Sequence, residues 1–111
     1  MKPFMFVIVA VPSKENRHYR NIFKAKVHIW VMDNNIDTAK QKALNDITAA
    51  HWIPQNVEHE FEMTDVQFDD LHEAEAVLYQ KALAYGIASD YIASPIHEKP
   101  KDSPVVIDDV Y

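Results

Sequence analysis

Cysteine is absent from this sequence of 111 residues, and glycine occurs only once. Without cysteine the chain has no disulfide, no zinc–thiolate centre and no cysteine nucleophile. Glycine-rich phosphate-binding loops and the sharp turn that presents a catalytic serine both need several glycines, so these sites are excluded as well. The residues carry no motif of a family with a known activity. We therefore favour a non-enzymatic role and expect no cofactor.

Long apolar runs are also missing, and none comes near the roughly 20 residues that a membrane-spanning helix requires. The longest run, residues 4–11, is followed at once by Pro12 and a charged stretch, not by the small residues of a signal-peptide cleavage site. We interpret it as a buried strand and expect a cytoplasmic protein that does not bind membranes. The 48% apolar and 25% charged shares are typical of a globular chain.

The N-terminal third of the chain predicts two strands. Residues 4–11 are apolar at every position, which is typical of a central strand buried on both faces. A polar connection follows over residues 14–22. Strict alternation of apolar and polar side chains over residues 23–32 then predicts a half-buried strand at an edge of the sheet.

A helix is predicted over residues 36–50, where apolar side chains recur at helical spacing. Asn35 or Asp37 can cap its first turn. The helix should end before Pro54, because the residue before a proline is pushed out of the helical region. Alternation over residues 57–63 predicts a further half-buried strand with its glutamates facing outward.

A second helix is predicted after Asp69 or Asp70, either of which can cap it. The single glycine, Gly86, stands where a left-handed residue would end this helix. Residues 87–93 fit either a fourth strand or a further helical turn. The predicted inner face of the helix consists of Leu71, Ala74, Leu78, Ala82 and Tyr85.

The predicted element order is β-β-α-β-α in a single α+β domain over residues 1–96. The sheet is antiparallel and three-stranded in the order 2-1-3, or four-stranded if residues 87–93 form a strand. Both helices are expected to cover one face of this sheet. Residues 97–111 are interpreted as a C-terminal tail, which either adds to a sheet edge as a strand or is a disordered terminus.

Two helices on one face would leave the other face of the sheet uncovered. A bare apolar face of that size is more than a monomer normally exposes, and basic and acidic edges can face each other across a two-fold axis. We therefore expect a homodimer that packs face to face; in the alternative monomer, the tail or a fourth strand covers the face. The predicted interface residues are Lys26, His28, Trp30, Met32, Glu58, Glu60 and Glu62.

Charge is distributed unevenly along the chain. Residues 14–42 hold seven cations and three anions, whereas residues 43–80 hold nine anions and neither Lys nor Arg. The net charge of −6 makes nucleic acid an unlikely partner and favours a basic protein partner. The one patch suited to nucleic acid contains Arg17, Tyr19, Arg20 and Lys24, and its simpler interpretation is a solvated loop.

A carboxylate–histidine cluster is the strongest metal-site candidate. Asp69, His72 and Glu75 lie within seven residues of one another, and His72 and Glu75 share a helix face. The simpler interpretation is that acidic side chains favour the N-terminus of a helix.

We accordingly predict a small acidic, non-catalytic interaction module, homodimeric through the open sheet face, that binds a basic protein through the acidic third strand and second helix. The alternative is a small-molecule- or metal-binding protein, or an enzyme, that uses the open sheet face or the cluster of Asp69, His72 and Glu75.

Overall fold

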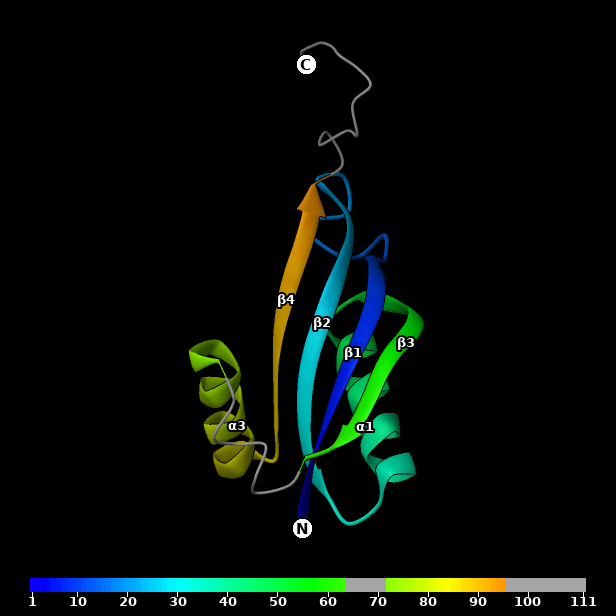
Figure 1. Cartoon of the computed structure of the whole chain (residues 1–111). Helices are drawn as coiled ribbons and strands as arrows, with labels where there is room; N and C mark the ends of the chain where they lie inside the picture. The colour runs from blue at the N-terminus through cyan, green and yellow to red at the C-terminus, as the bar shows by residue number, and fades with distance from the viewer. Residues whose placement is uncertain (64–71, 96–111) are drawn as a thin grey trace.

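The computed structural model describes residues 1–63 and 72–95 (Figure 1). The predicted tail and the predicted caps Asp69 and Asp70 lie outside these residues. Within them, no helix is both long and apolar enough to cross a membrane. The elements in chain order are β1 (Lys2–Pro12), β2 (Ile22–Asp33), α1 (Ile36–Ala49), β3 (Trp52–Glu62), α3 (Glu73–Tyr85) and β4 (Ile87–Pro95).

The strands form one antiparallel sheet in the order β3-β1-β2-β4. The inner position of β1 confirms the prediction from its unbroken apolar run, and the predicted order of the first three strands is confirmed with it. Residues 87–93 belong to β4, which pairs with β2. The prediction that β2 lies at an edge is therefore wrong. The fold is α+β with the order β-β-α-β-α-β.

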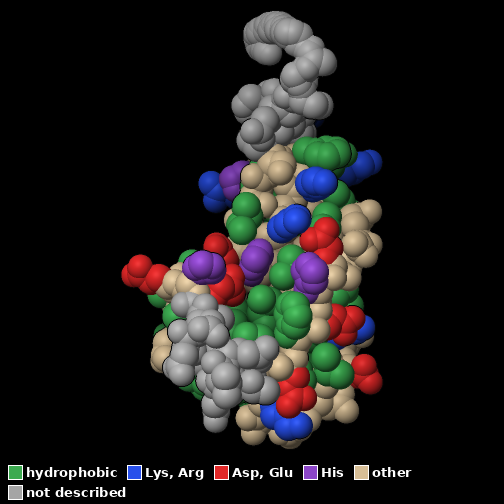
Figure 2. All heavy atoms as spheres, viewed as in Figure 1, with side chains coloured by type: hydrophobic (Ala, Val, Ile, Leu, Met, Phe, Trp, Pro, Cys, Tyr) green, Lys and Arg blue, Asp and Glu red, His purple; other side chains and the backbone are tan. Residues whose placement is uncertain are grey.

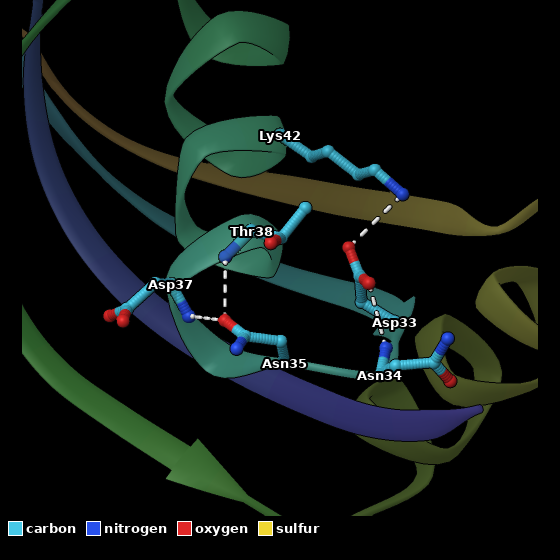
Figure 3. A network of polar contacts seen from close by, with 6 residues as sticks. All are labelled: Asp33, Asn34, Asn35, Asp37, Thr38 and Lys42. Carbon is cyan, nitrogen blue, oxygen red and sulfur yellow. Dashed lines mark hydrogen bonds and ion pairs between the residues drawn. The ribbon is translucent and has the colours of Figure 1, made fainter.

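α1 begins and ends through local hydrogen bonds. The side-chain Oδ1 of Asn35 accepts the backbone N–H groups of Asp37 at 2.8 Å and Thr38 at 3.1 Å, so Asn35 is the N-cap (Figure 3). The helix ends at Ala49, before Pro54 as predicted. Its buried residues Ala39, Ala43 and Ile47 pack on the sheet.

Asp33 joins the end of β2 to α1. Its Oδ1 accepts the backbone N–H of Asn34 at 2.7 Å, and its Oδ2 lies 3.0 Å from Nζ of Lys42 in α1 (Figure 3). The N–H of Asn34 and the adjacent ammonium of Lys42 hold the pKa of Asp33 below its ordinary value of 3.8. The carboxylate is therefore stabilised in its charged form.

The two helices lie on opposite faces of the sheet, so the prediction that both cover one face is wrong. α1 packs in one core with Phe6 and Ile29, whereas Leu78 and Ala82 of α3 pack on Trp30. Neighbouring residues of a strand point to opposite faces, so Ile29 and Trp30 lie on opposite faces of β2. In Figure 1, α1 lies behind the strands and α3 lies beside β4.

β3 changes the face of its side chains partway along. Val57 pairs with Ile8 on the α1 side, whereas His59 pairs with Val7 on the other side, and the register shifts between these pairs. Glu58 is therefore the extra residue of a bulge. The predicted uniform alternation over residues 57–63 is wrong for this reason.

The glutamates of β3 consequently do not form one row. Glu60 pairs with Phe6 and Glu62 pairs with Phe4, which places both glutamates on the α1 side of the sheet. An ion pair of 3.0 Å between Glu60 and Lys40 of α1 agrees with this placement. The expectation that these two glutamates share a face with Trp30 is wrong.

Candidate functional site

The face of the sheet turned away from α1 is called the front face here, and it is the face seen in Figure 2. Val7 of β1 is buried on it, with His28 of β2 and His59 of β3 as its cross-strand neighbours. Histidine side chains accordingly lie across the middle of this face in Figure 2. α3 packs over the part around Trp30.

One carboxylate connects α3 to the front face. Glu75 accepts the indole N–H of Trp30 on Oε1 at 2.8 Å, and its Oε2 lies 2.9 Å from Nδ1 of His28. The contact has the length of a hydrogen bond between this ring nitrogen and the carboxylate. The pair orients a histidine as a general base would require. It also satisfies the buried indole N–H, which is a sufficient structural reason for the contact.

The predicted metal cluster is not assembled by the described residues. Asp69 lies outside them. His72 is exposed at the N-cap position of α3, whereas Glu75 faces the sheet, where Trp30 and His28 occupy both of its oxygens. Residues 1–63 and 72–95 contain no group of three or more His, Asp or Glu side chains that could hold a metal ion.

The predicted dimer face is divided between different environments. Trp30 is fully buried and Met32 is half-buried, both in the α3 core. Lys26 remains exposed on the front face, where its Nζ lies 3.4 Å from the carboxylate of Glu58. The prediction that Trp30 is exposed for a partner is wrong, because α3 already covers it.

The glutamates of β3 each have a cation within the chain. Besides the Lys40–Glu60 and Lys26–Glu58 pairs, Glu62 lies 3.5 Å from Nζ of Lys2. Most of these side chains are exposed, so each pair contributes little to stability. The pairs nevertheless reduce the negative field that β3 can offer to a basic partner.

α3 carries an apolar outer face that the sequence analysis missed. Val77 is 48% exposed and Tyr85 79%, and both lie on this face; Leu83, 49% exposed, lies on another side of the helix. Of its predicted inner face, Leu78 and Ala82 are buried as expected, Ala74 and Tyr85 are exposed contrary to expectation, and Leu71 lies outside the described residues. The signal in the sequence that could have indicated this face is that apolar residues occur on all sides of the helix. The hollow on its outer side, of about 380 Å³, is lined by Glu73, Ala76, Val77, Gln80, Lys81, Ala84 and Tyr85.

The connection between β1 and β2 is anchored at its base. The backbone N–H and the hydroxyl of Ser13 and the side-chain amide of Asn16 all donate to the carbonyl oxygen of His51, over 3.0, 3.1 and 2.9 Å. Asn16 is buried, and its Oδ1 accepts the backbone N–H of His18 at 2.8 Å. A polar loop is thereby fixed to the turn between α1 and β3.

The predicted nucleic-acid candidates Arg17, Tyr19, Arg20 and Lys24 are all exposed on or beside this loop. With Lys14, the three cations among them form what is called the basic tip below. No ion pair among residues 1–63 and 72–95 involves a cation of the basic tip. In Figure 2, Lys and Arg side chains gather toward the upper end of the molecule, whereas Asp and Glu lie mainly below.

No protein-family model, curated protein or solved structure matches this chain. Its function is therefore argued from the described surfaces.

Proposed function

We propose that this chain is a non-catalytic, self-associating interaction module whose two copies meet through the outer face of α3. The observation that carries the proposal is the exposure of Val77 and Tyr85, which line one hollow on the outer side of α3. A helix that is apolar all round is normally buried all round. Monomers rarely leave contiguous apolar surface in water, so the outer face of α3 is suited to a protein contact.

The charges on this face favour a second copy as the occupant. Glu73 and Lys81 line the same hollow as Val77, which lies midway between them in the sequence. They stand eight residues apart, or about 12 Å along the helix. Two antiparallel copies of α3 related by a two-fold axis near Val77 would place each Glu73 opposite the partner's Lys81. Such self-complementarity is what a two-fold interface requires.

The size of this contact sets the expected affinity. A helix of 13 residues is about 20 Å long, so one helix pair buries less than the roughly 1,200 Å² at the lower end of standard interfaces. We therefore expect micromolar association. The proposal keeps the predicted homodimer but moves its interface from the sheet face to α3.

Sedimentation velocity between about 1 and 200 μM tests the proposal, because an interface of this size should dissociate within that range. We expect a rise from the monomer to the dimer mass. Val77→Glu should keep the chain monomeric throughout, because it places two carboxylates beside the two-fold axis. Ile53→Glu is the matched control, since Ile53 is equally exposed but lies on β3, and it should leave the dimer intact.

A charge exchange gives the sharper version of the experiment. Glu73→Lys and Lys81→Glu should each weaken the dimer, whereas the double exchange should restore it, because opposite charges again face each other across the axis. A wild-type chain that stays monomeric at 200 μM would refute the proposal. A double variant as weak as its parents would refute the two-fold arrangement.

The alternative of a ligand-binding protein or enzyme rests on the His28–Glu75 pair. Among the described residues, the hydrogen bonds of this pair reach only Trp30. Docking of α3 accounts for the pair without a ligand. A thermal-shift screen with metal ions and metabolites tests this alternative, and a shift that His28→Gln abolishes would favour it.

A further inference from the structure

We propose that the basic tip binds single-stranded nucleic acid, with its cations on the phosphates and with Tyr19 and Phe23 stacked against bases. This inference goes beyond self-association and concerns the opposite end of the molecule. The tip follows the end of β1, whereas α3 lies beside the start of β4 (Figure 1). It comprises Lys14, Arg17, Arg20 and Lys24.

The cations of the basic tip differ from most other cations of the chain. Lys2, Lys26, Lys40 and Lys42 each lie within 4.0 Å of a carboxylate, whereas none of the ion pairs between described residues reaches the tip. Glu15 is the single acidic residue between Ser13 and Lys26. Among residues 1–63 and 72–95 the tip is therefore locally positive although the chain as a whole is negative, and local charge determines where phosphates bind.

Two aromatic side chains are exposed at this site. Tyr19 is 43% exposed and Phe23 is 61% exposed. Both line one hollow of about 600 Å³, together with Val11, Pro12, Arg20 and Ile22. Nζ of Lys24 lies 5.9 Å from the centre of the Phe23 ring, so a cation stands beside the apolar surface. Aromatic platforms flanked by cations are how single-strand-binding proteins hold successive bases and phosphates.

The loop at the tip is ordered before any ligand arrives. Three donors from Ser13 and Asn16 converge on one carbonyl oxygen, and backbone hydrogen bonds within the loop join Tyr19 to Asn16 and Ile22 to His18. A preorganised loop loses little conformational entropy on binding, which favours affinity.

The geometry favours a single strand over other anions. Four cations carry more charge than one small phosphate can neutralise, whereas a chain of phosphates can contact them in turn. Duplex nucleic acid hides its base faces, which would leave Tyr19 and Phe23 without stacking partners. An acidic peptide offers charge but no flat rings.

Fluorescence anisotropy with the whole chain and a labelled oligothymidine of about 15 nucleotides tests this inference in about 50 mM salt. We expect saturable binding that weakens with salt, because each neutralised phosphate of a single strand adds about −0.7 to the log–log salt slope. Arg17→Gln with Arg20→Gln should weaken binding at least about tenfold and reduce the slope by about 1.4. Each single arginine variant should reduce the slope by about 0.7, and Lys2→Gln, an equal charge change on an exposed lysine far from the tip, is the matched control for these single variants.

The aromatic residues are tested separately. Tyr19→Ala and Phe23→Ala should each weaken binding about fivefold or more, with the salt slope unchanged. A duplex of the same length and an acidic peptide should bind more weakly than the single strand. Absence of binding at 50 mM salt would overturn the inference. Equal binding of the duplex or the peptide, or equal loss in Lys2→Gln, would overturn it too, since the contact would then be unspecific attraction between charges.

Discussion

α1 and α3 are helices of nearly equal length, 14 and 13 residues, but they meet solvent in different ways. α1 is buried along Ala39, Ala43 and Ile47, and its outer face is polar. α3 is buried only at Leu78 and Ala82, and much of its outer face is apolar. The difference teaches that the described residues cover the apolar face of α1, whereas they leave much of the apolar surface of α3 exposed.

The helices also differ in what fixes their first turns. Asn35 caps α1 with two side-chain hydrogen bonds, whereas His72 makes no side-chain cap bond at the start of α3. α3 relies instead on Glu75, which reaches across to β2. α1 therefore begins through local bonds, and α3 is held by a tertiary contact.

The largest expected effect is at this tertiary contact. Glu75→Ala removes the carboxylate that accepts the indole N–H of Trp30 and contacts His28, and loss of such a partly buried hydrogen-bond partner costs about 1–3 kcal/mol of unfolding free energy. Urea unfolding followed by tryptophan emission in a Trp52→Phe background isolates the signal of Trp30. Glu73→Ala is the control, because Glu73 is exposed on the same turn; at about 1 μM protein, where the proposed dimer is dissociated, it should change stability by less than about 0.5 kcal/mol. Equal losses in both variants would contradict the assigned role of Glu75.

A smaller effect is expected at the caps, with opposite outcomes for the two helices. Asn35→Ala should reduce the unfolding free energy by about 1 kcal/mol, because the N–H groups of Asp37 and Thr38 lose their acceptor. His72→Ala should change it by less than about 0.5 kcal/mol, since its side chain accepts no cap bond. Thermal unfolding of the two variants side by side measures the contrast, and a larger loss in His72→Ala would reverse it.

No effect is expected at neutral pH for the last site, whose contribution to stability changes only at alkaline pH: it lies in the α1 core, where Tyr91 packs against Trp52. Burial, aided by the negative charge of Asp46, raises the pKa of Tyr91 to about 12. The unfolded chain releases this proton near pH 10, whereas the folded chain retains it, so stability falls as the pH rises from about 10 to 12. Tyr91→Phe should flatten this part of the stability curve.

Below pH 10 the same variant provides a second readout. The Tyr91 hydroxyl has no hydrogen-bond partner among the described residues, so its removal should leave stability unchanged or slightly higher. Denaturant unfolding at neutral and alkaline pH compares the two chains. An alkaline slope as steep in Tyr91→Phe as in the wild type would show that other groups cause it.

The parts of the fold that were predictable follow from strong local signals. An unbroken apolar run belongs in the middle of a sheet, which is where β1 lies. Asn35 caps the N-terminus of α1 with its side chain, and Gly86 ends α3 with a left-handed φ of 88°. These features depend on neighbours in sequence or on burial alone.

The face chosen by α3 was not predictable in the same way. Both faces of β2 carry apolar side chains, since Ile29 points to one and Trp30 to the other. A helix that is apolar all round gives no direction from which to choose between them. The bulge at Glu58 was equally hidden, because one extra residue in a strand exchanges its faces without any mark in the composition.

The site predictions failed for related reasons. Trp30 was placed on an open surface because α3 was placed on the other side of the sheet, and Glu60 and Glu62 joined it because the bulge was not seen. The basic tip was identified from residue types alone. Its anchoring to His51 was not foreseen, because that contact joins segments 35 and 38 residues apart.

Because both faces of β2 pack against a core, the register of this strand is restricted by the size of its side chains as well as by their polarity. If β2 shifted by one position against β1, Trp30 would turn into the α1 core, where its place is now taken by the smaller Ile29 or Val31. The vacated space under α3 would receive Ile29 or Val31, neither of which carries a donor for Glu75. A misaligned hairpin would thus be overfilled on one side and underfilled on the other. The unequal size of the side chains on the two faces of β2 therefore helps to specify the register in which β2 pairs with β1.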